Sequence, residues 1–292
     1  MTEADMNDRE SATSVVVGID GSRSALDAAL WAVDEAVSRD VPLRLVYAID
    51  PDRCTGSSNE DAAHDLATAE IAVRHALMAV ESTDKPVKIE VEILQDRPLN
   101  ALRAESRWAA MLCVGSKGLV HSSRGRIGST ASALATSAHC PVAVVYAHDP
   151  LSSKRGWVVA DATESARANG ALRHAIEEAQ LRGAPLRVLT TWQSRPTDVG
   201  QRAASEVIGL AEAELDRRLA EWKTRHPALD IRAVAVHGSI LDYLAEHADS
   251  IQLVVTARDR AHGIAELVGP RGCGVLRNAN CSVLVCDPQN VL

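Results

Sequence analysis

Short aliphatic runs alternate with longer amphipathic segments along most of the chain. In the first half the runs are rich in β-branched residues and lie at 15–19, 43–48, 87–94, 111–114 and 142–146. Nearly continuous apolar runs of this length are typical of strands buried on both faces of a parallel sheet. The pattern therefore predicts five buried strands in the first half.

The segments between the runs have helical periodicity. Apolar residues at spacings of three and four mark one face of each predicted helix. They are Leu26, Leu30, Val33 and Val37 in the first segment, Leu66, Val73, Leu77 and Val80 in a longer one, and Val207, Ala211, Leu215, Leu219 and Trp222 in its counterpart in the second half. Strands that alternate with helices at these lengths predict an α/β fold with a doubly wound parallel sheet.

The second half repeats the first. Asp161 lies 141 residues after Asp20, and Gly269 lies 141 residues after Gly128, so both ends of the repeat are in register. In the middle, PLRLVYAID and PLRVLTTWQ match at a separation of 143. At 292 residues the chain has room for about two domains of ~150 residues each. We expect tandem domains at 14–147 and 156–287, a linker at 148–155 and a disordered tail at 1–13.

A glycine pattern carries the first candidate chemistry. Residues 115–129 read GSKGLVHSSRGRIGS, directly after an apolar run and directly before an alanine-rich helical segment. A helix that begins near Gly128 would point the free N–H groups of residues 129–131 at the carboxyl ends of the strands, which favours an anion. Gly115 and Gly118 would let the backbone approach a phosphate without a Cβ between them, and Ser129 offers a hydroxyl.

Each of these residues also has a plain structural interpretation. Gly115 and Gly118 could be turn residues, and Gly128 with Ser129 could form an ordinary helix start. Asp20, at the end of the first run, could cap the following helix, or its carboxylate could accept hydrogen bonds from sugar hydroxyls or the adenine amine. The ordered set, with a strand before it and a helix after it, favours a phosphate site.

Charge and composition exclude several classes of partner. The formal net charge is −8 and the pI about 5.7, so bulk electrostatics do not favour nucleic acid or an anionic membrane. We find no apolar stretch of membrane-spanning length and no secretory signal, and expect a soluble cytoplasmic protein. The 6 cysteines and 10 histidines show no metal-ligand spacing, so no metal site is expected.

Three segments together resemble a known family. GIDGS follows the first strand, G-x2-G-x9-G-[ST] precedes the last helix of the half, and HCPVAVV forms its closing strand. This combination resembles the ATP-binding branch of the universal stress protein family, and the duplication resembles its tandem members. The resemblance implies a sheet of order 3-2-1-4-5 in each half, with ATP, with or without Mg²⁺, as the ligand. It also implies pairing through fifth strands, so the two halves are expected to form an internal pseudo-dimer, and a homodimer stays possible.

The resemblance assigns contacts to particular positions of this chain. It places Asp20 near the adenosine, Ala48 by the adenine, and Val114 and Gly115 by the ribose. At the phosphates it places Gly118, Gly128, Ser129 and Thr130.

The second half keeps the layout but departs from the motif. Asp161 and Gly269 are retained, whereas Thr256, Asp259 and Pro270 stand in place of Gly115, Gly118 and Ser129. A carboxylate about 5 Å from a phosphate would repel it by roughly 3 kcal/mol at an effective dielectric constant near 20. Nearby arginines, Arg258, Arg260 and Arg271, can offset this repulsion. We therefore predict a degenerate second site.

The sequence favours a nucleotide-binding regulator over an enzyme. It contains no G-x4-G-K-[ST] loop and no S-G-G-x-D-S loop, although Lys117, His121, Arg124 and Arg126 could neutralise phosphates. We expect ATP occupancy of the first domain to modulate conformation or the binding of a regulatory partner, with little or no hydrolysis. A slow ATPase or nucleotidyl transferase, and a scaffold in which ATP is only a structural ligand, are the alternatives.

Overall fold

The computed structural model describes residues 13–52, 59–119, 127–146, 156–162, 168–192, 201–259 and 263–286. The chain divides into two compact units, residues 1–152 and 153–292. The tail and the linker expected at 1–13 and 148–155 lie almost wholly outside the described residues.

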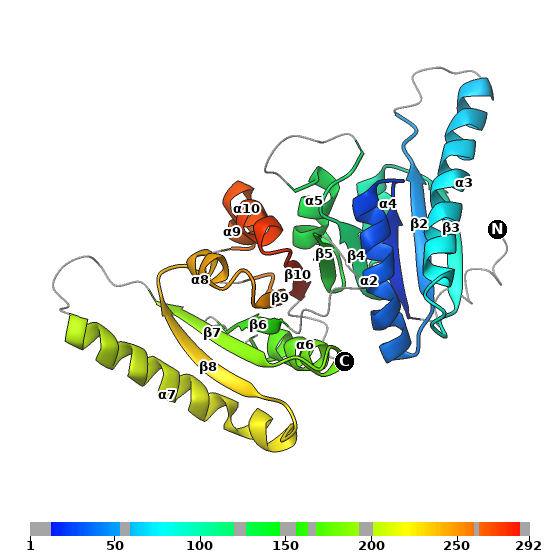
Figure 1. The fold of residues 1–292 in the computed structure, drawn as a ribbon. Helices are drawn as coiled ribbons and strands as arrows, with labels where there is room; N and C mark the ends of the chain where they lie inside the picture. The colour runs from blue at the N-terminus through cyan, green and yellow to red at the C-terminus, as the bar shows by residue number, and fades with distance from the viewer. Residues whose placement is uncertain are drawn as a thin grey trace. The chain divides into compact units, whose positions relative to one another are not determined.

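The first unit is a parallel sheet in the order β3-β2-β1-β4-β5, flanked by helices (Figure 1). Its strands are β1 (Ser14–Ile19), β2 (Leu43–Ile49), β3 (Ile89–Gln95), β4 (Ala109–Gly115) and β5 (Val142–Val145). Its helices are α2 (Arg23–Arg39), α3 (Asn59–Glu81), α4 (Pro98–Glu105) and α5 (Ser129–Ser137). With the strands numbered in chain order within the unit, the order is 3-2-1-4-5, which confirms the sequence-based prediction for this half.

The second unit has the same topology. Its strands run in the order β10-β9-β6-β7-β8, all parallel. They are β6 (Trp157–Asp161), β7 (Leu186–Trp192), β8 (Ile231–His237), β9 (Ile251–Ala257) and β10 (Ser282–Cys286). The helices are α6 (Ala168–Leu181), α7 (Gln201–Arg225), α8 (Ile240–Glu246), α9 (Ala265–Val268) and α10 (Pro270–Asn278). The pairing of β1 with β4 has a register shift at the start of β1, and the pairing of β6 with β9 has the same shift at the start of β6.

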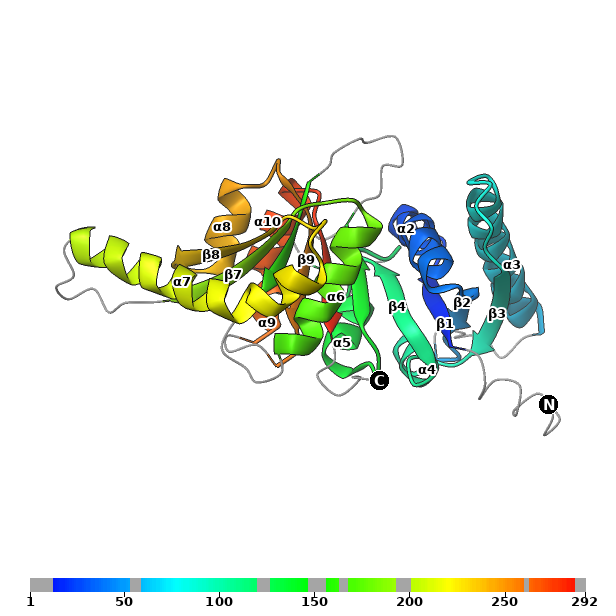
Figure 2. The same ribbon diagram turned by 90° about the horizontal axis from the view of Figure 1, so that it is seen from below.

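Helices cover both faces of the first sheet, as Figure 2 shows for α2 and α3 on one side and α4 on the other. Successive strand residues point to opposite faces, so each strand contributes to two cores. The core under α4 and α5 is aliphatic and contains Val16, Val46, Leu102, Leu112, Leu134 and Val144, all of them buried.

The predicted helix faces are only partly correct. On α2 the fully buried positions are mainly alanines, while Leu26 and Leu30 are half-buried. Small side chains allow a helix to pack closely on a sheet, and the leucines then lie beside the contact. Leu66 on α3 and Val207 on α7 are 44% and 40% exposed, so both were wrongly expected to face a core.

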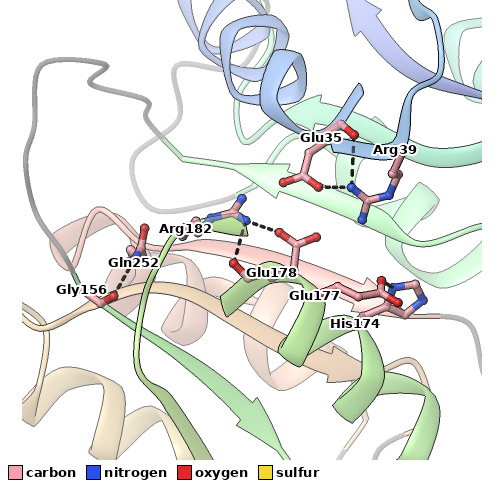
Figure 3. A network of polar contacts seen from close by, with 8 residues as sticks. All are labelled: Glu35, Arg39, Gly156, His174, Glu177, Glu178, Arg182 and Gln252. Carbon is pink, nitrogen blue, oxygen red and sulfur yellow. Dashed lines mark hydrogen bonds and ion pairs between the residues drawn. The ribbon is translucent and has the colours of Figure 1, made fainter. Parts of the chain in front are cut away.

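A buried ion pair also recurs in both units (Figure 3). On α2, the guanidinium of Arg39 contacts the carboxylate of Glu35 and donates to its backbone carbonyl at 3.3 Å. On α6, Arg182 makes the same two contacts with Glu178. Both glutamates are 0% exposed. A charge that is buried this deeply needs a partner of opposite charge, so the pair is expected to matter for stability.

Candidate functional site

A cavity of about 600 Å³ opens at the carboxyl ends of the strands in the first unit. This is the edge where ligands of open parallel sheets bind. The structure brings all eight residues expected from the sequence to this one cavity: Asp20, Ala48, Val114, Gly115, Gly118, Gly128, Ser129 and Thr130. They come from the ends of three strands, the glycine loop and the first turn of α5.

Asp20 does not cap the helix that follows it. The N-cap of α2 is Ser22, whose hydroxyl oxygen accepts from the N–H of Ala25 at 3.1 Å. Asp20 instead holds the turn, because its Oδ1 accepts from the N–H of Ser22 at 2.9 Å. Its other oxygen, Oδ2, faces Gly118. The carboxylate is therefore fixed at the cavity wall with one oxygen directed toward the glycine loop.

Two serines that the sequence did not single out fasten the start of the glycine loop. The hydroxyl of Ser22 donates to the carbonyl of Lys117 at 3.2 Å, and the N–H of Lys117 donates to Oγ of Ser24 at 3.3 Å. The N–H of Gly128 donates to the carbonyl of Ser116 at 2.9 Å, which closes the loop at its base. Ser22 belongs to the GIDGS segment, but nothing in the local sequence marks Ser24, because its partner lies 93 residues away.

The three glycines have different reasons to lack a side chain. A Cβ on Gly115 would lie 2.5 Å from the backbone carbonyl carbon of Ser24, so this glycine lets β4 and α2 approach each other. A Cβ on Gly118 would lie 2.8 Å from Oδ2 of Asp20. At Gly128 the nearest atom would be 3.7 Å away, an ordinary contact. Close packing therefore requires Gly115 whether or not a phosphate binds.

The N-terminus of α5 is open toward the cavity. Its N-cap, Gly128, has no side chain to accept hydrogen bonds from the first turn, and no side-chain cap is present. The N–H groups of the first turn of a helix have no intrahelical acceptor. Ser129, Thr130 and Ala131 line the cavity, so this end of it offers backbone donors and the positive end of the helix dipole.

Further charged residues line the cavity at the ends of β2, β3 and α3. They are Asp50, Asp65 and Arg97, together with Lys117 of the glycine loop. Arg97 donates through Nε to Asp52 at 2.7 Å, and this hydrogen bond raises the pKa of the guanidinium. The contribution of Asp65 could not be read from the sequence, since it requires knowing how α3 lies over the strand ends. His121, Arg124 and Arg126 lie outside the described residues.

The corresponding strand ends of the second unit carry different residues. Thr256 is fully buried, and its hydroxyl donates to Oδ2 of Asp161 at 3.5 Å. Pro270 is the first residue of α10, so this helix start has one fewer N–H donor. Gly269 packs against the carbonyl of Ala265 in the short preceding helix α9, where a Cβ would clash. Asp259 is exposed, and Arg260 lies outside the described residues.

Two other classes of site, a metal centre and a membrane span, have no candidate among the described residues. No group of three or more His, Cys, Asp or Glu side chains there is placed to hold a metal ion. Likewise, none of the helices in the described part of the chain has the length and apolar character needed to cross a membrane.

Known proteins match both halves of the chain. The model of the Universal stress protein family matches residues 12–146 and again residues 157–287. Universal stress protein Rv2028c of Mycobacterium tuberculosis is 47% identical over 286 residues, which is 97% of this chain and 99% of the relative. Universal stress protein Rv3134c of the same organism is 47% identical over 282 residues, or 94% of this chain and 100% of the relative.

A solved structure shows the same architecture. The crystal structure of a universal stress protein from Archaeoglobus fulgidus superposes with a TM-score of 0.69 at 16% identity, covering 94% of this chain and 96% of that one. At this identity the likeness concerns the fold. Two family matches and near full-length relatives together show that the chain belongs to the universal stress protein family, of which it contains two tandem domains.

Proposed function

We propose that the first domain binds an adenine nucleotide, ATP above all, and that its occupancy modulates conformation or partner binding in a stress response. The observation that carries this proposal is the single cavity of about 600 Å³ lined by all eight expected residues. Its size lies within the range of about 300–1,000 Å³ that is usual for small-molecule sites.

The two ends of the cavity suit the two ends of a nucleotide. Val46, Ala48 and Leu102 provide apolar surface near β2 and α4, where a base can be buried. Ser129 and Thr130 provide backbone donors at the other end, where an anion is favoured. Asp20 accepts hydrogen bonds only, when ionised, and therefore suits the ribose hydroxyls rather than the phosphates.

We further propose that the second domain does not bind a nucleotide in the same way. The buried Thr256 hydroxyl already uses Asp161, and Pro270 removes one helix N–H. Asp259, at the position of Gly118, adds a negative charge. The first change occupies the carboxylate that would accept from the ribose hydroxyls. The other two disfavour a phosphate, by deleting a donor and by repulsion.

Slow or absent hydrolysis is part of the proposal, and its basis is the sequence. Fast phosphoryl transfer requires a positioned nucleophile and cations on the transferring group, usually built on a dedicated phosphate loop. When Mg²⁺–ATP is bound, the metal would neutralise part of the phosphate charge. The chain's own contribution would be the α5 amides, the hydroxyl of Ser129 and the amino group of Lys117.

Amide hydrogen exchange with and without ATP, together with a multiple-turnover assay, tests this function. Regulation predicts slower exchange in α5 and the glycine loop, changes beyond the cavity, and no sustained ADP release. Sustained turnover that is lost in Gly118→Asp would instead show an ATPase. Protection confined to the cavity, with only a higher melting temperature, would indicate a structural ligand. No binding at millimolar ATP would refute the proposal.

A further inference from the structure

An arginine at the same place in both repeats has very different surroundings. Arg44 of β2 pairs with Glu90 of β3 in the sheet register, and Arg187 of β7 pairs with Arg232 of β8 in the equivalent register. Both arginines are largely buried, with side chains 13% and 10% exposed. The two positions can therefore be compared residue by residue.

In the first domain, carboxylates surround the arginine. Arg44 lies 2.7 Å from Glu105, 3.6 Å from Glu90 and 3.9 Å from Glu92. A hydrogen bond from Lys88, with a contribution from Arg44, lowers the pKa of Glu90, so this carboxylate is ionised. All three acidic side chains therefore lie within 4.0 Å of this guanidinium.

In the second domain, none of these carboxylates is retained. The register places Arg232 where Glu90 stands and Val234 where Glu92 stands. His247 replaces Glu105, since each lies eight residues after the N-cap of its helix, Arg97 for α4 and Ser239 for α8. Three acidic residues have become one basic, one apolar and one imidazole side chain.

A groove of about 540 Å³ lies along β8 and includes the positions of this exchange. It is defined by Trp157, Arg187, Tyr243, Glu246, His247 and residues 232–237, and is called the β8 groove below. Three rings gather at one end. The ring centroids of Tyr243 and His247 are 4.2 Å apart, and those of Trp157 and His247 are 5.6 Å apart. The guanidinium of Arg187 lies over the ring of Trp157, 5.1 Å from its centroid.

The β8 groove contains two guanidinium groups, those of Arg187 and Arg232, and one carboxylate, that of Glu246, among its lining residues. Burial opposes ionisation of Asp230, but hydrogen bonds from Arg232 and Arg187 lower its pKa, and this one carboxylate serves both guanidinium groups. Arg232 contacts it through Nε and is 66% exposed. Glu246 lines the groove and is exposed. Burial raises the pKa of Tyr243, Arg187 opposes this shift and Glu246 adds to it, so the phenol is protonated at neutral pH.

We propose that the β8 groove binds a small planar aromatic anion. Its ring would lie on the apolar floor of Val234 and Val236, against Trp157 and His247. Its carboxylate would pair with the exposed guanidinium of Arg232. The groove combines aromatic rings, apolar strand residues and guanidinium groups, which are the kinds of groups that hold small aromatic anions. All of its residues belong to the second domain, so the proposal does not depend on nucleotide binding by the first.

Indole-3-acetate is a suitable probe, and its uncharged amide is the matched control ligand. Isothermal titration calorimetry of the full chain should show saturable binding of the acid and about tenfold weaker binding of the amide, because the amide lacks the charge-assisted hydrogen bond. The variant Arg232→Gln should weaken binding of the acid by a similar factor. Equal affinity for acid and amide would overturn the assignment of charge recognition to this groove.

A second variant tests the location. Val234→Glu restores the residue type that the first domain carries at this position, so the fold is expected to accept it, and circular dichroism checks this. It should reduce affinity by more than tenfold, through lost volume and like-charge repulsion. Leu210→Glu is the control, with the same charge change at a position of α7 that is 72% exposed and outside the groove. Absence of binding at millimolar probe, or equal loss in both variants, would overturn the proposal.

Discussion

Substitutions at Gly118 can separate the effect of a negative charge on ATP affinity from the effect of a bulkier side chain. A Cβ at this position would lie 2.8 Å from Oδ2 of Asp20, so any side chain crowds the carboxylate. The second domain has Asp259 in the equivalent position. Comparing Gly118→Asp with Gly118→Asn introduces two side chains of nearly the same shape that differ in one negative charge.

The expected magnitudes follow from Coulomb's law. A carboxylate about 5 Å from a phosphate, at an effective dielectric constant of about 20, repels it by roughly 3 kcal/mol. This corresponds to about a hundredfold in affinity. Gly118→Asn should lose affinity through crowding alone, and Gly118→Asp should bind ATP about a hundredfold more weakly than Gly118→Asn. Raising the salt concentration should narrow that difference, because exposed charges are screened.

Calorimetric titration with ATP measures both variants, and thermal unfolding shows whether each still folds. The comparison is valid only between variants with similar melting temperatures. If Gly118→Asp and Gly118→Asn bound ATP with equal affinity, the phosphates would not lie beside Gly118, and the assignment of this end of the cavity would be wrong.

Three further predictions concern packing and charge. Gly115→Ala should destabilise the first domain by about 1–3 kcal/mol, because its Cβ would lie 2.5 Å from the backbone of α2. Gly128→Ala should leave the melting temperature nearly unchanged, since its Cβ would make only an ordinary contact. Equal effects of the two substitutions on the melting temperature would contradict this difference in packing. Arg39→Met should lower the free energy of unfolding by about 1.5–3 kcal/mol in a denaturant titration, since it deletes a charged hydrogen bond to the buried Glu35. An unchanged free energy of unfolding would show that the pair is dispensable. Asp242 completes a capping box with Ser239, the N-cap of α8, and hydrogen bonds from Ser239 lower the pKa of its carboxyl below the ordinary 3.8. Its stabilising effect is therefore present above that value and is lost as the pH falls through the lowered pKa. Asp242→Asn should cost stability at pH 7 but much less at pH 2, and a pH-independent difference would refute this.

Much of the fold follows from the sequence because its signals are local. Buried parallel strands are nearly continuous apolar runs, and the repeat at a separation of 141 residues shows that both halves share one topology. The strand order 3-2-1-4-5 was confirmed in each unit. The glycine loop followed from its own spacing and flanks, and its residues do converge on one cavity. Their ligand contacts stay predictions.

The features that were missed depend on partners far apart in the sequence. The leucines of α2 gave the stronger helical signal, but the alanines make the close contact with the sheet. Gly115 was interpreted as a phosphate-approach residue, and the tighter constraint proves to be Ser24, at the start of a helix about ninety residues earlier. The β8 groove is lined by residues from β6, β7, β8 and the end of α8, which are separated in the sequence, so no local motif marks it.

The stoichiometry of ATP binding tests the central assignment most directly. Chain freed of bound nucleotide and titrated with ATP in the presence of Mg²⁺ should bind about one nucleotide per chain, and Gly118→Asp should abolish that binding in the same concentration range. A ratio near two would contradict the assignment of the second domain. No binding at millimolar ATP would contradict the nucleotide site itself.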